Sequence, residues 1–511
     1  MSNHVKVVSF LIVALLAFAA SASAQGVPRI EDKPCWFKPP RGEQARCLVL
    51  TVRENRQLDT SRLIRLPVAI LKARGSAPAA DPVLHLSGGP GDSPLSASEP
   101  GGDAMNDGDW WNSTVELRRR RDYIIIGQRG AKLSEPELRC EDLDVQRSFL
   151  TRAGRPSEAV ERERAAMARC AQRLSTSGVD LAQYNTLSLA DDVADLAQAL
   201  GLRQINLHGV SYGTRWALEV MRRHPSLVRS AVLDAVYPPH IVADDGEADI
   251  VRGVFERLYA DCAADARCGR RHPHLRARLE GLIERMEAEP VPLKLNLADG
   301  KTEVAMTGGK VLLTLLHMMR LGGTEIGRLP YVIDRTIRGD YVPLTFYATD
   351  LEESEGGLAD DGPPEMGGLY NAVECRENSQ LVDPAARRRA IEANGIYGLV
   401  PRLNTAPDTC PAWRVPSAPA AQRQPVRSAI PTLLLSGAYD WLTPPAWAVD
   451  QLRYLDNARH IEFRALGHAT VVQGNCAARL VDFFTLHADP KRLPSCIERN
   501  SPPAFIDSLR R

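Results

Sequence analysis

Short apolar runs recur along most of the chain, and several are continuous rather than alternating in polarity. Continuous runs of about four to eight apolar residues are typical of strands that are covered on both faces of a parallel sheet. Amphipathic helical segments lie between some of these runs, so the pattern predicts an α/β fold with a mostly parallel sheet. The predicted strands are Leu48–Val52, Leu66–Leu71, Val83–Leu86, Tyr123–Ile126, Ile205–His208, Ala231–Leu233, Thr432–Leu435 and His460–Phe463.

The best-defined helix signal follows Ser188. Ser188 and Asp191 form a capping-box-like start, Val193 and Leu196 begin an apolar face at helical spacing, and Gly201 is the predicted stop.

The pattern changes between Tyr237 and Gln424, where strand signals are sparse and helical segments such as 251–261, 275–287 and 310–321 dominate. We interpret residues 237–424 as a helical insertion between two sheet strands, placed as a lid. The predicted organisation is a signal peptide at 1–24, a first part of the sheet domain at 25–236, the insertion at 237–424 and a second part of the sheet domain at 425–511.

The N-terminus has the pattern of a secretory signal peptide. Lys6 precedes an apolar run, Val7–Ala20, and the small residues Ala22–Ala24 follow, so cleavage is predicted before Gln25. A membrane anchor is the alternative, but the run is shorter than the ~20 apolar residues that span a bilayer. The sequence therefore predicts a secreted or periplasmic protein with no membrane span after cleavage.

Ten cysteines follow the predicted cleavage site: Cys35, Cys47, Cys140, Cys170, Cys262, Cys268, Cys375, Cys410, Cys476 and Cys496. An even number in an oxidising compartment indicates disulfides. Spacing alone cannot assign the connectivity, and our hypothesis is that neighbours in the sequence pair. The chain has no Cys-x-x-Cys, so we expect no metal site.

The strongest chemical signal is Gly209-Val210-Ser211-Tyr212-Gly213, which lies directly after an apolar strand and directly before a helical segment. A sharp strand-to-helix turn admits only small residues two positions either side of the serine and exposes its hydroxyl. In that context the pattern predicts that Ser211 is a nucleophile.

A serine nucleophile needs a base and a carboxylate that orients the base, and in this architecture the order along the chain is serine, acid, histidine. Asp440 and His468 each follow a predicted strand, so both are expected at the carboxyl edge of the sheet. Asp234, which follows Ala231–Leu233, is the rival acid.

Acyl transfer also requires backbone N–H donors for the oxyanion. Tyr212, which follows the nucleophile, is the first predicted donor, and the Ser87-Gly88-Gly89-Pro90-Gly91 loop supplies the second through Gly88 or Gly89.

At these residues the chain resembles the α/β-hydrolase peptidases typified by proline iminopeptidase and the secreted tripeptidyl aminopeptidases. Five segments and two single residues carry the resemblance: Cys47–Val52, Ser87–Gly91, Gln128–Gly130, Gly209–Gly213, Ala372–Glu377, Asp440 and His468. The resemblance implies an α/β-hydrolase fold and cleavage near a free peptide N-terminus. This chain departs from the family in having Ser87 before Gly-Gly-Pro-Gly and Gly127 before Gln-Arg-Gly. We interpret Arg129 mainly as structural support for the glycine-rich loop.

Selection of a free N-terminus requires an ionised acceptor for the α-ammonium group. Glu374 and Glu377 lie in the segment that resembles the family's amine-binding motif, with solvated surface glutamates as the alternative. A disulfide from Cys375, with Cys410 as one candidate partner, would hold this segment over the site.

Lys plus Arg and Asp plus Glu each total 63, so the formal net charge is zero and a nucleic-acid partner is not expected. The run Arg118–Arg121 is interpreted as a solvated helix end. The sequence thus predicts an exported serine hydrolase that acts on peptides without a cofactor. An esterase or lipase with the same triad, or a non-catalytic binding protein on this fold, is the alternative, and the oligomeric state is not specified.

Overall fold

The computed structural model describes residues 26–95, 110–140, 156–297, 300–353, 367–404 and 406–509. The predicted signal peptide, residues 1–24, lies outside these ranges. In the part of the chain that is described, no helix is both long and apolar enough to cross a membrane.

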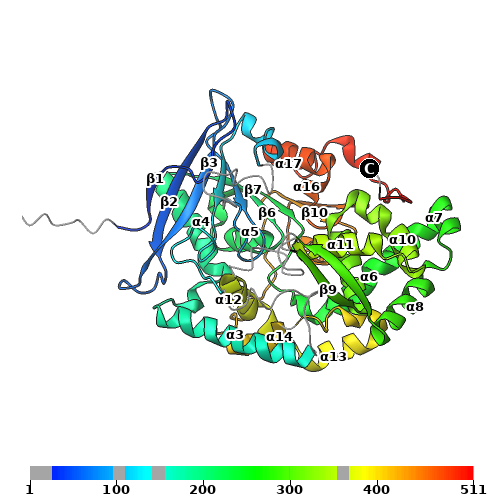
Figure 1. Ribbon diagram of the computed structural model, residues 1–511. Helices are drawn as coiled ribbons and strands as arrows, with labels where there is room; N and C mark the ends of the chain where they lie inside the picture. The colour runs from blue at the N-terminus through cyan, green and yellow to red at the C-terminus, as the bar shows by residue number, and fades with distance from the viewer. Residues whose placement is uncertain are drawn as a thin grey trace, which may run out of the picture.

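The described residues form a nine-stranded sheet in the order β1-β2-β3-β5-β4-β6-β7-β10-β11 (Figure 1). Strands β1, β2 and β3 are antiparallel and β3 pairs antiparallel with β5, whereas all pairs from β5 to β11 are parallel. The strands are β1 (Arg29–Lys33), β2 (Ala45–Arg53), β3 (Leu63–Leu71), β4 (Val83–Leu86), β5 (Tyr123–Ile126), β6 (Ile205–Val210), β7 (Val228–Asp234), β10 (Thr432–Gly437) and β11 (Ala458–Phe463). The eight predicted strands and the mostly parallel sheet are confirmed. The sequence analysis did not predict strand β1, because three of its five residues are charged and exposed, as is common at a sheet edge.

Helices cover both faces of the sheet. One face packs on α4 and α5 through residues such as Leu189 and Trp216, and the other packs on α17 through residues such as Leu480 and Phe484. The helices associated with the sheet are α1 (Trp110–Ser113), α3 (Pro156–Thr176), α4 (Thr186–Leu200), α5 (Tyr212–Arg223), α15 (Pro445–Leu452), α16 (Thr470–Gln473) and α17 (Asn475–His487). This two-sided cover explains why the central strands have continuous apolar sequences.

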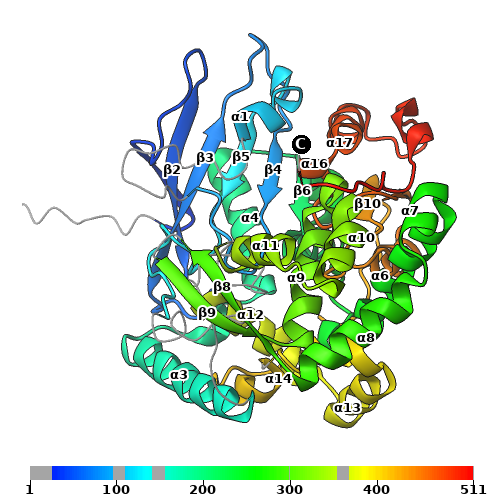
Figure 2. The same cartoon turned by 45° about the vertical axis from the view of Figure 1, so that its right-hand side comes forward.

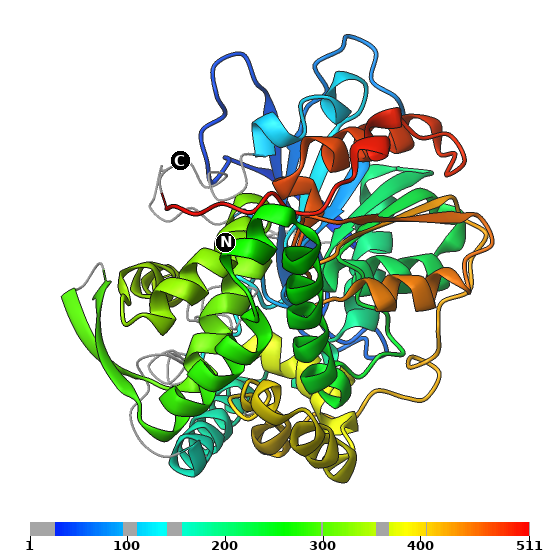
Figure 3. The same cartoon turned by 90° about the vertical axis from the view of Figure 1, so that its right-hand side faces the viewer.

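The region between β7 and β10 is mainly helical (Figure 2). It has a hydrophobic core of its own. It comprises α6 (Ala243–Ala264), α7 (Ala266–Arg271), α8 (Leu275–Ala288), the hairpin β8 (Val291–Leu297) and β9 (Gly300–Met306), α9 (Gly308–Leu321), α10 (Gly323–Ile337), α11 (Val342–Glu353), α12 (Gly367–Glu377), α13 (Pro384–Ala393) and α14 (Ala406–Thr409). The hairpin projects from these helices (Figure 3), and its two strands pair with each other in an antiparallel register. The sequence analysis missed it, although the alternation of polar and apolar residues in β8 is a strand signal.

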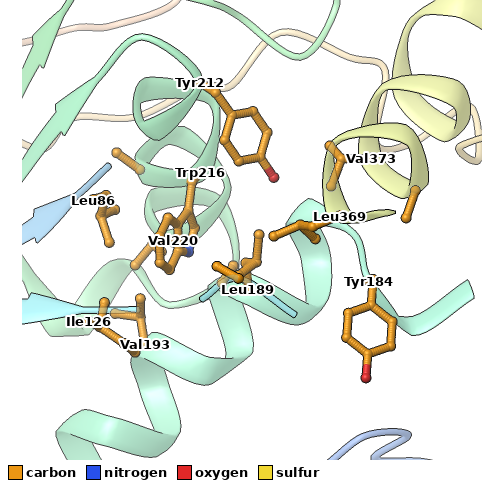
Figure 4. Close-up of a cluster of buried hydrophobic side chains, with 14 of the residues drawn as sticks. Leu86, Ile126, Tyr184, Leu189, Val193, Tyr212, Trp216, Val220, Leu369 and Val373 are labelled. Atoms are coloured by element: carbon orange, nitrogen blue, oxygen red, sulfur yellow. The ribbon is translucent and has the colours of Figure 1, made fainter. Parts of the chain in front are cut away.

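Helix α12 packs differently from the rest of this region. Its Leu369 and Val373 belong to the core of the sheet domain and lie beside Leu189 of α4 and Tyr212 of α5 (Figure 4). This helix therefore packs beside α5, which begins directly after the candidate nucleophile Ser211.

Helix α4 starts three residues earlier than the Ser188 signal suggested. Its N-cap is Asn185, whose side chain accepts a hydrogen bond from the Ser188 N–H. The prediction that Ser188 caps this helix was therefore wrong. Asparagine serves this role because its short side chain reaches the free N–H groups of the first turn. The predicted stop is confirmed, since Gly201 adopts φ 67° at the C-cap.

The prediction of a solvated Arg118–Arg121 run was wrong for two of its members. Arg118 is fully buried and donates to Glu43 at 2.5 Å, and the largely buried Arg121 pairs with Asp81 at 2.9 Å. Each buried guanidinium is neutralised by a carboxylate about 40 or more positions away, which no local pattern reveals.

All five disulfides join neighbours in sequence order, which confirms the pairing hypothesis. The pairs are Cys35–Cys47, Cys140–Cys170, Cys262–Cys268, Cys375–Cys410 and Cys476–Cys496. The Cys375 bond holds α12 to the segment that follows α14, so the carboxyl end of α12 is covalently restrained.

We expect the Cys375→Ala/Cys410→Ala variant to lose more stability than Cys262→Ala/Cys268→Ala. The first bond closes a loop of 35 residues and the second a loop of 6. The chain-entropy relation gives about 4 and about 2 kcal/mol for such loops. Thermal melting of the two double variants under non-reducing conditions measures the difference, and equal melting temperatures would contradict it.

Candidate active site

Ser211 lies in a strained turn between β6 and α5. Its φ is 55° and its ψ −127°, a conformation that a residue with a side chain rarely adopts. A Cβ on Gly209 would lie 2.5 Å from the Gly213 carbonyl oxygen, and a Cβ on Gly213 would lie 2.8 Å from the Ser87 carbonyl oxygen. The two glycines are therefore required by backbone packing, as the Gly-x-Ser-x-Gly pattern predicted.

Asp234 lies at the end of β7 and connects this turn to the loop that carries His468. The Ser211 N–H donates to the Asp234 carbonyl oxygen at 2.9 Å. The Asp234 carboxylate accepts from the Thr470 N–H and hydroxyl at 3.1 and 2.8 Å and from the Val471 N–H at 2.9 Å. Burial raises the pKa of Asp234 to about 6, against the lowering effect of these hydrogen bonds. Asp234, the rival acid, thus anchors the histidine loop.

Asp440 contacts the His468 ring directly. Asp440 Oδ2 lies 2.8 Å from His468 Nδ1, and both side chains are buried. Asp440 also accepts from the Leu442 and Thr443 N–H groups at 3.0 and 2.9 Å and from the Thr443 hydroxyl at 2.6 Å. The carboxylate is held by a turn of its own loop and can orient the imidazole. The sequence interpretation missed Thr443, whose only local signal is its position three residues after Asp440.

The Ser87–Gly91 loop packs against the turn that carries Ser211. The close contact of Gly213 with the carbonyl oxygens of Leu86 and Ser87 places Tyr212, the residue after Ser211, beside this loop. Gly89 adopts φ 103°, a conformation that suits glycine. The two predicted sources of oxyanion donors are therefore adjacent in the structure.

Gln128 holds this loop. Its Nε2 donates to the Gly88 carbonyl oxygen at 2.7 Å and to the Ser87 hydroxyl at 3.1 Å, and its Oε1 accepts from the Gly91 N–H at 3.0 Å. The neighbouring Arg129 bonds Asp192 of α4 with two hydrogen bonds of 2.8 and 2.7 Å. The loop support that we assigned to Arg129 thus comes directly from Gln128, whereas the Arg129 side chain bonds α4.

Packing explains why this chain has glycine at position 127, where it departs from the family that it resembles. A Cβ at this position would lie 2.5 Å from Pro67 Cγ of the neighbouring strand β3. No side chain, and so no carboxylate, fits here while Pro67 occupies β3.

Glu377 is buried and fully engaged at the start of α4. Its Oε1 accepts from the Thr186 N–H at 2.8 Å and its Oε2 from the Thr186 hydroxyl at 2.6 Å. The same hydroxyl lies 2.8 Å from the Tyr212 hydroxyl. Through Thr186, Glu377 therefore connects α12 to Tyr212, the residue that follows Ser211. The alternative that Glu377 is a solvated surface glutamate is wrong.

Glu374 is also buried, so the surface alternative is wrong for both glutamates. Burial raises the pKa of Glu374 to about 7, and Arg215 is the nearby charge that opposes this shift most. Arg215 lies one helical turn after Ser211, is fully buried, and stacks over the Tyr237 ring at 3.6 Å from its centroid. Its Nη1 is 4.0 Å from Glu377 Oε2, and among the described residues neither its Nη1 nor its Nε has a hydrogen-bond partner. Sequence reasoning missed Arg215, whose only signal is its spacing of four residues from Ser211.

Within the described ranges, no group of three or more His, Cys, Asp or Glu side chains is arranged to hold a metal ion. The arrangement at the strand ends instead combines a strained serine, a histidine–carboxylate pair and a glycine-rich loop. Such a set can carry out nucleophilic acyl transfer.

The match to a known protein family agrees with this architecture. Residues 81–272 match the family described as the alpha/beta hydrolase fold, and residues 400–494 match the one described as TAP-like protein. The serine protease Hip1 of Mycobacterium tuberculosis is 24% identical over 412 residues, which cover 76% of this chain and 75% of that protein. Among solved structures, the chain is similar to proline iminopeptidase of Mycobacterium smegmatis, with 13% identity, a TM-score of 0.38 and coverage of 86% of this chain and 98% of that one. A thermophilic esterase from Thermogutta terrifontis gives 14% identity, a TM-score of 0.36 and the same two coverages.

We expect Asp440→Asn to slow reaction of Ser211 with a fluorophosphonate probe far more than Asp234→Asn does. Loss of the carboxylate that orients the base costs roughly 10⁴-fold in turnover in serine hydrolases. Asp234→Asn keeps the Asp234 carbonyl bond to Ser211 and weakens only the bonds to Thr470 and Val471. Labelling rates of the two variants decide between the acids, and a larger loss for Asp234→Asn would reverse the assignment.

Proposed function

We propose that this protein, a serine hydrolase of the α/β-hydrolase fold, is an exported aminopeptidase that cleaves peptides near a free N-terminus. Ser211, His468 and Asp440 are the proposed triad, and Glu374 and Glu377 form the proposed amine site. The observation that carries the proposal is the buried carboxylate of Glu374 on α12, next to the helix that Ser211 begins.

In the proposed mechanism, the Ser211 hydroxyl attacks the scissile carbonyl carbon while His468 takes its proton. Asp440, bonded to Nδ1, fixes the tautomer so that Nε2 is the base, and it stabilises the imidazolium that forms. The N–H of Tyr212 and those of Gly88 or Gly89 donate to the oxyanion. The imidazolium then protonates the leaving amine, which leaves an acyl-enzyme. Water, deprotonated by His468, hydrolyses the ester and restores Ser211.

Glu374 is the better acceptor for the substrate's ammonium group. Both oxygens of Glu377 already accept from Thr186, whereas burial leaves the charged form of Glu374 poorly stabilised. A cation beside Glu374 would remove that penalty. A charge-assisted hydrogen bond is worth ~1.5–3 kcal/mol, or roughly a ten- to hundred-fold preference for a free over a blocked amine.

Arg215 supports the same assignment through the local charge balance. This guanidinium interacts with both glutamates, so one cation faces two buried carboxylates. Asp244, also buried, adds further negative charge to the surroundings of Glu374. The cluster therefore favours one additional positive charge, which a peptide N-terminus supplies.

Export is supported by the disulfides and by the N-terminal sequence pattern. Five disulfides suit an oxidising compartment rather than a reducing cytosol. The insertion between β7 and β10 is proposed to act as a cap over the site.

The decisive experiment compares free and N-acetylated peptide amides on wild type and Glu374→Gln. We expect Glu374→Gln to lower kcat/KM for free peptides about ten- to hundred-fold and to leave blocked peptides unaffected. Glu219→Gln is the matched control, because Glu219 is a buried carboxylate with a burial-raised pKa on α5. Equal rates on free and blocked peptides in wild type would reject amine recognition. Hydrolysis of simple esters alone would indicate an esterase, and no labelling of Ser211 would indicate a binding protein.

The pH dependence of KM provides a second prediction. Because the pKa of Glu374 is about 7, its carboxylate is ionised above that pH and protonated below it. A peptide α-amino group, with a pKa of about 7.7–8.0, loses its charge above that range. We therefore expect KM for a free peptide to be lowest between about pH 7 and 8 and to rise as the pH falls below 7. Glu374→Gln should remove the rise on the acid side, and its persistence in that variant would contradict the assignment.

A further inference from the structure

The carboxyl end of cap helix α9 lies directly against the loop that carries His468. The His468 N–H donates to the Arg320 carbonyl oxygen at 3.2 Å, and the Gly323 N–H, just after α9, donates to the Ala465 carbonyl oxygen at 2.9 Å. Arg320 is the penultimate residue of α9, where helix carbonyls lack intrahelical partners. The backbone N–H of His468, the proposed base, thus donates to a carbonyl group at the end of α9.

Gln473 bridges the same two elements. Its Nε2 donates to the Arg320 carbonyl oxygen at 2.8 Å and also to the His468 carbonyl oxygen. Its Oε1 accepts from the Gly467 N–H at 2.8 Å. One amide side chain therefore fixes the peptide groups on both sides of His468 and attaches them to α9.

Close backbone packing leaves this junction little freedom. A Cβ on Gly467 would lie 2.7 Å from the Arg320 carbonyl oxygen and closer still to that of Met319. A Cβ on Gly322 would collide with the Gln473 side chain. The loop and the helix end are in direct contact, with no room for a side chain between them.

The loop that carries Asp440 is attached to the cap in the same way. Trp441 Nε1 donates to the Leu316 carbonyl oxygen of α9 at 3.0 Å, and the Tyr439 hydroxyl donates to Asp261 of α6 at 2.8 Å. Both aromatic rings belong to the core of the cap. Asp440 is thus flanked on each side by a residue packed in the cap.

We propose that Gln473 is a positioning residue, and that α9 is a fixed support for His468 and Asp440 rather than part of a lid that moves away from them. This inference rests on the proposed function for its catalytic consequence. Gln473 does not touch substrate; it sets the position of the His468 backbone, and so the direction of the imidazole toward Ser211. A displacement of about 1 Å in a reacting group can cost roughly 10²-fold in rate.

The test compares Gln473→Ala with Gln451→Ala. Gln451 is the matched control, because its side chain, like that of Gln473, bonds to the backbone. Its two hydrogen bonds both go to Val426, which lies outside the two triad loops. We expect Gln473→Ala to lower kcat and the fluorophosphonate labelling rate by about 10²-fold with KM little changed. Gln451→Ala should lower the melting temperature and leave kcat unchanged.

Gln473→Glu keeps the size of the side chain and the acceptor for Gly467 but loses both donated bonds when ionised. Its deficit in labelling rate relative to wild type should shrink as the pH falls and the carboxyl becomes protonated. A structural role alone would not produce this recovery, and a deficit that is independent of pH would count against the proposal.

A spectroscopic readout separates this inference from the proposed function. The Nδ1 proton shared by His468 and Asp440 should give a low-field proton NMR signal in wild type and Gln451→Ala and be broadened or lost in Gln473→Ala. Absence of labelling in wild type would overturn the proposed function alone. An intact NMR signal in Gln473→Ala, with or without a wild-type labelling rate, would overturn the positioning role.

Discussion

Asp234 joins the strained turn that bears Ser211 to the loop that bears His468, and the arrangement of the candidate site depends on this connection. Its carbonyl accepts from Ser211, while its carboxylate accepts from Thr470 and Val471. A fully buried carboxylate is costly unless it is hydrogen-bonded, so the three bonds that satisfy it also fix the histidine loop. The strain at Ser211, with φ 55°, persists because the elements around it are fixed in this way.

Buried polar and charged side chains organise the surroundings of this centre in a similar manner. Gln128 holds the glycine-rich loop, and its neighbour Arg129 pairs with Asp192 of α4. Helix α12 reaches the start of α4 through Glu377 and Thr186, and Thr186 contacts Tyr212. Breaking one partner of such a set leaves the other buried without compensation, so the geometry near Ser211 is held by mutually dependent contacts.

The division into sheet domain and insertion is less clean in space than along the chain. Leu369 and Val373 of α12 pack in the sheet core, whereas Tyr439 and Trp441, which follow β10, pack in the core of the insertion. The loops that carry Asp440 and His468 therefore lie where the two cores meet. This exchange of side chains explains how a large insertion between β7 and β10 can coexist with a site that needs sub-ångström positioning.

The sequence by itself determined the features that depend on neighbours along the chain. Continuous apolar runs specified the buried strands, Gly209 and Gly213 specified the sharp turn around Ser211, and the cysteine order agreed with the disulfides. These properties follow from backbone sterics and from side-chain periodicity, which are local. Only the tertiary structure decided which side chains satisfy each buried polar group. Asn185 rather than Ser188 caps α4, and Gln128 rather than Arg129 holds the glycine-rich loop. Thr470 rather than His468 bonds the Asp234 carboxylate, and Arg215 lies beside the two glutamates of α12. Those partners come from distant segments that meet only when the sheet and the insertion pack, and the cost of burying an unpaired polar group then selects among them.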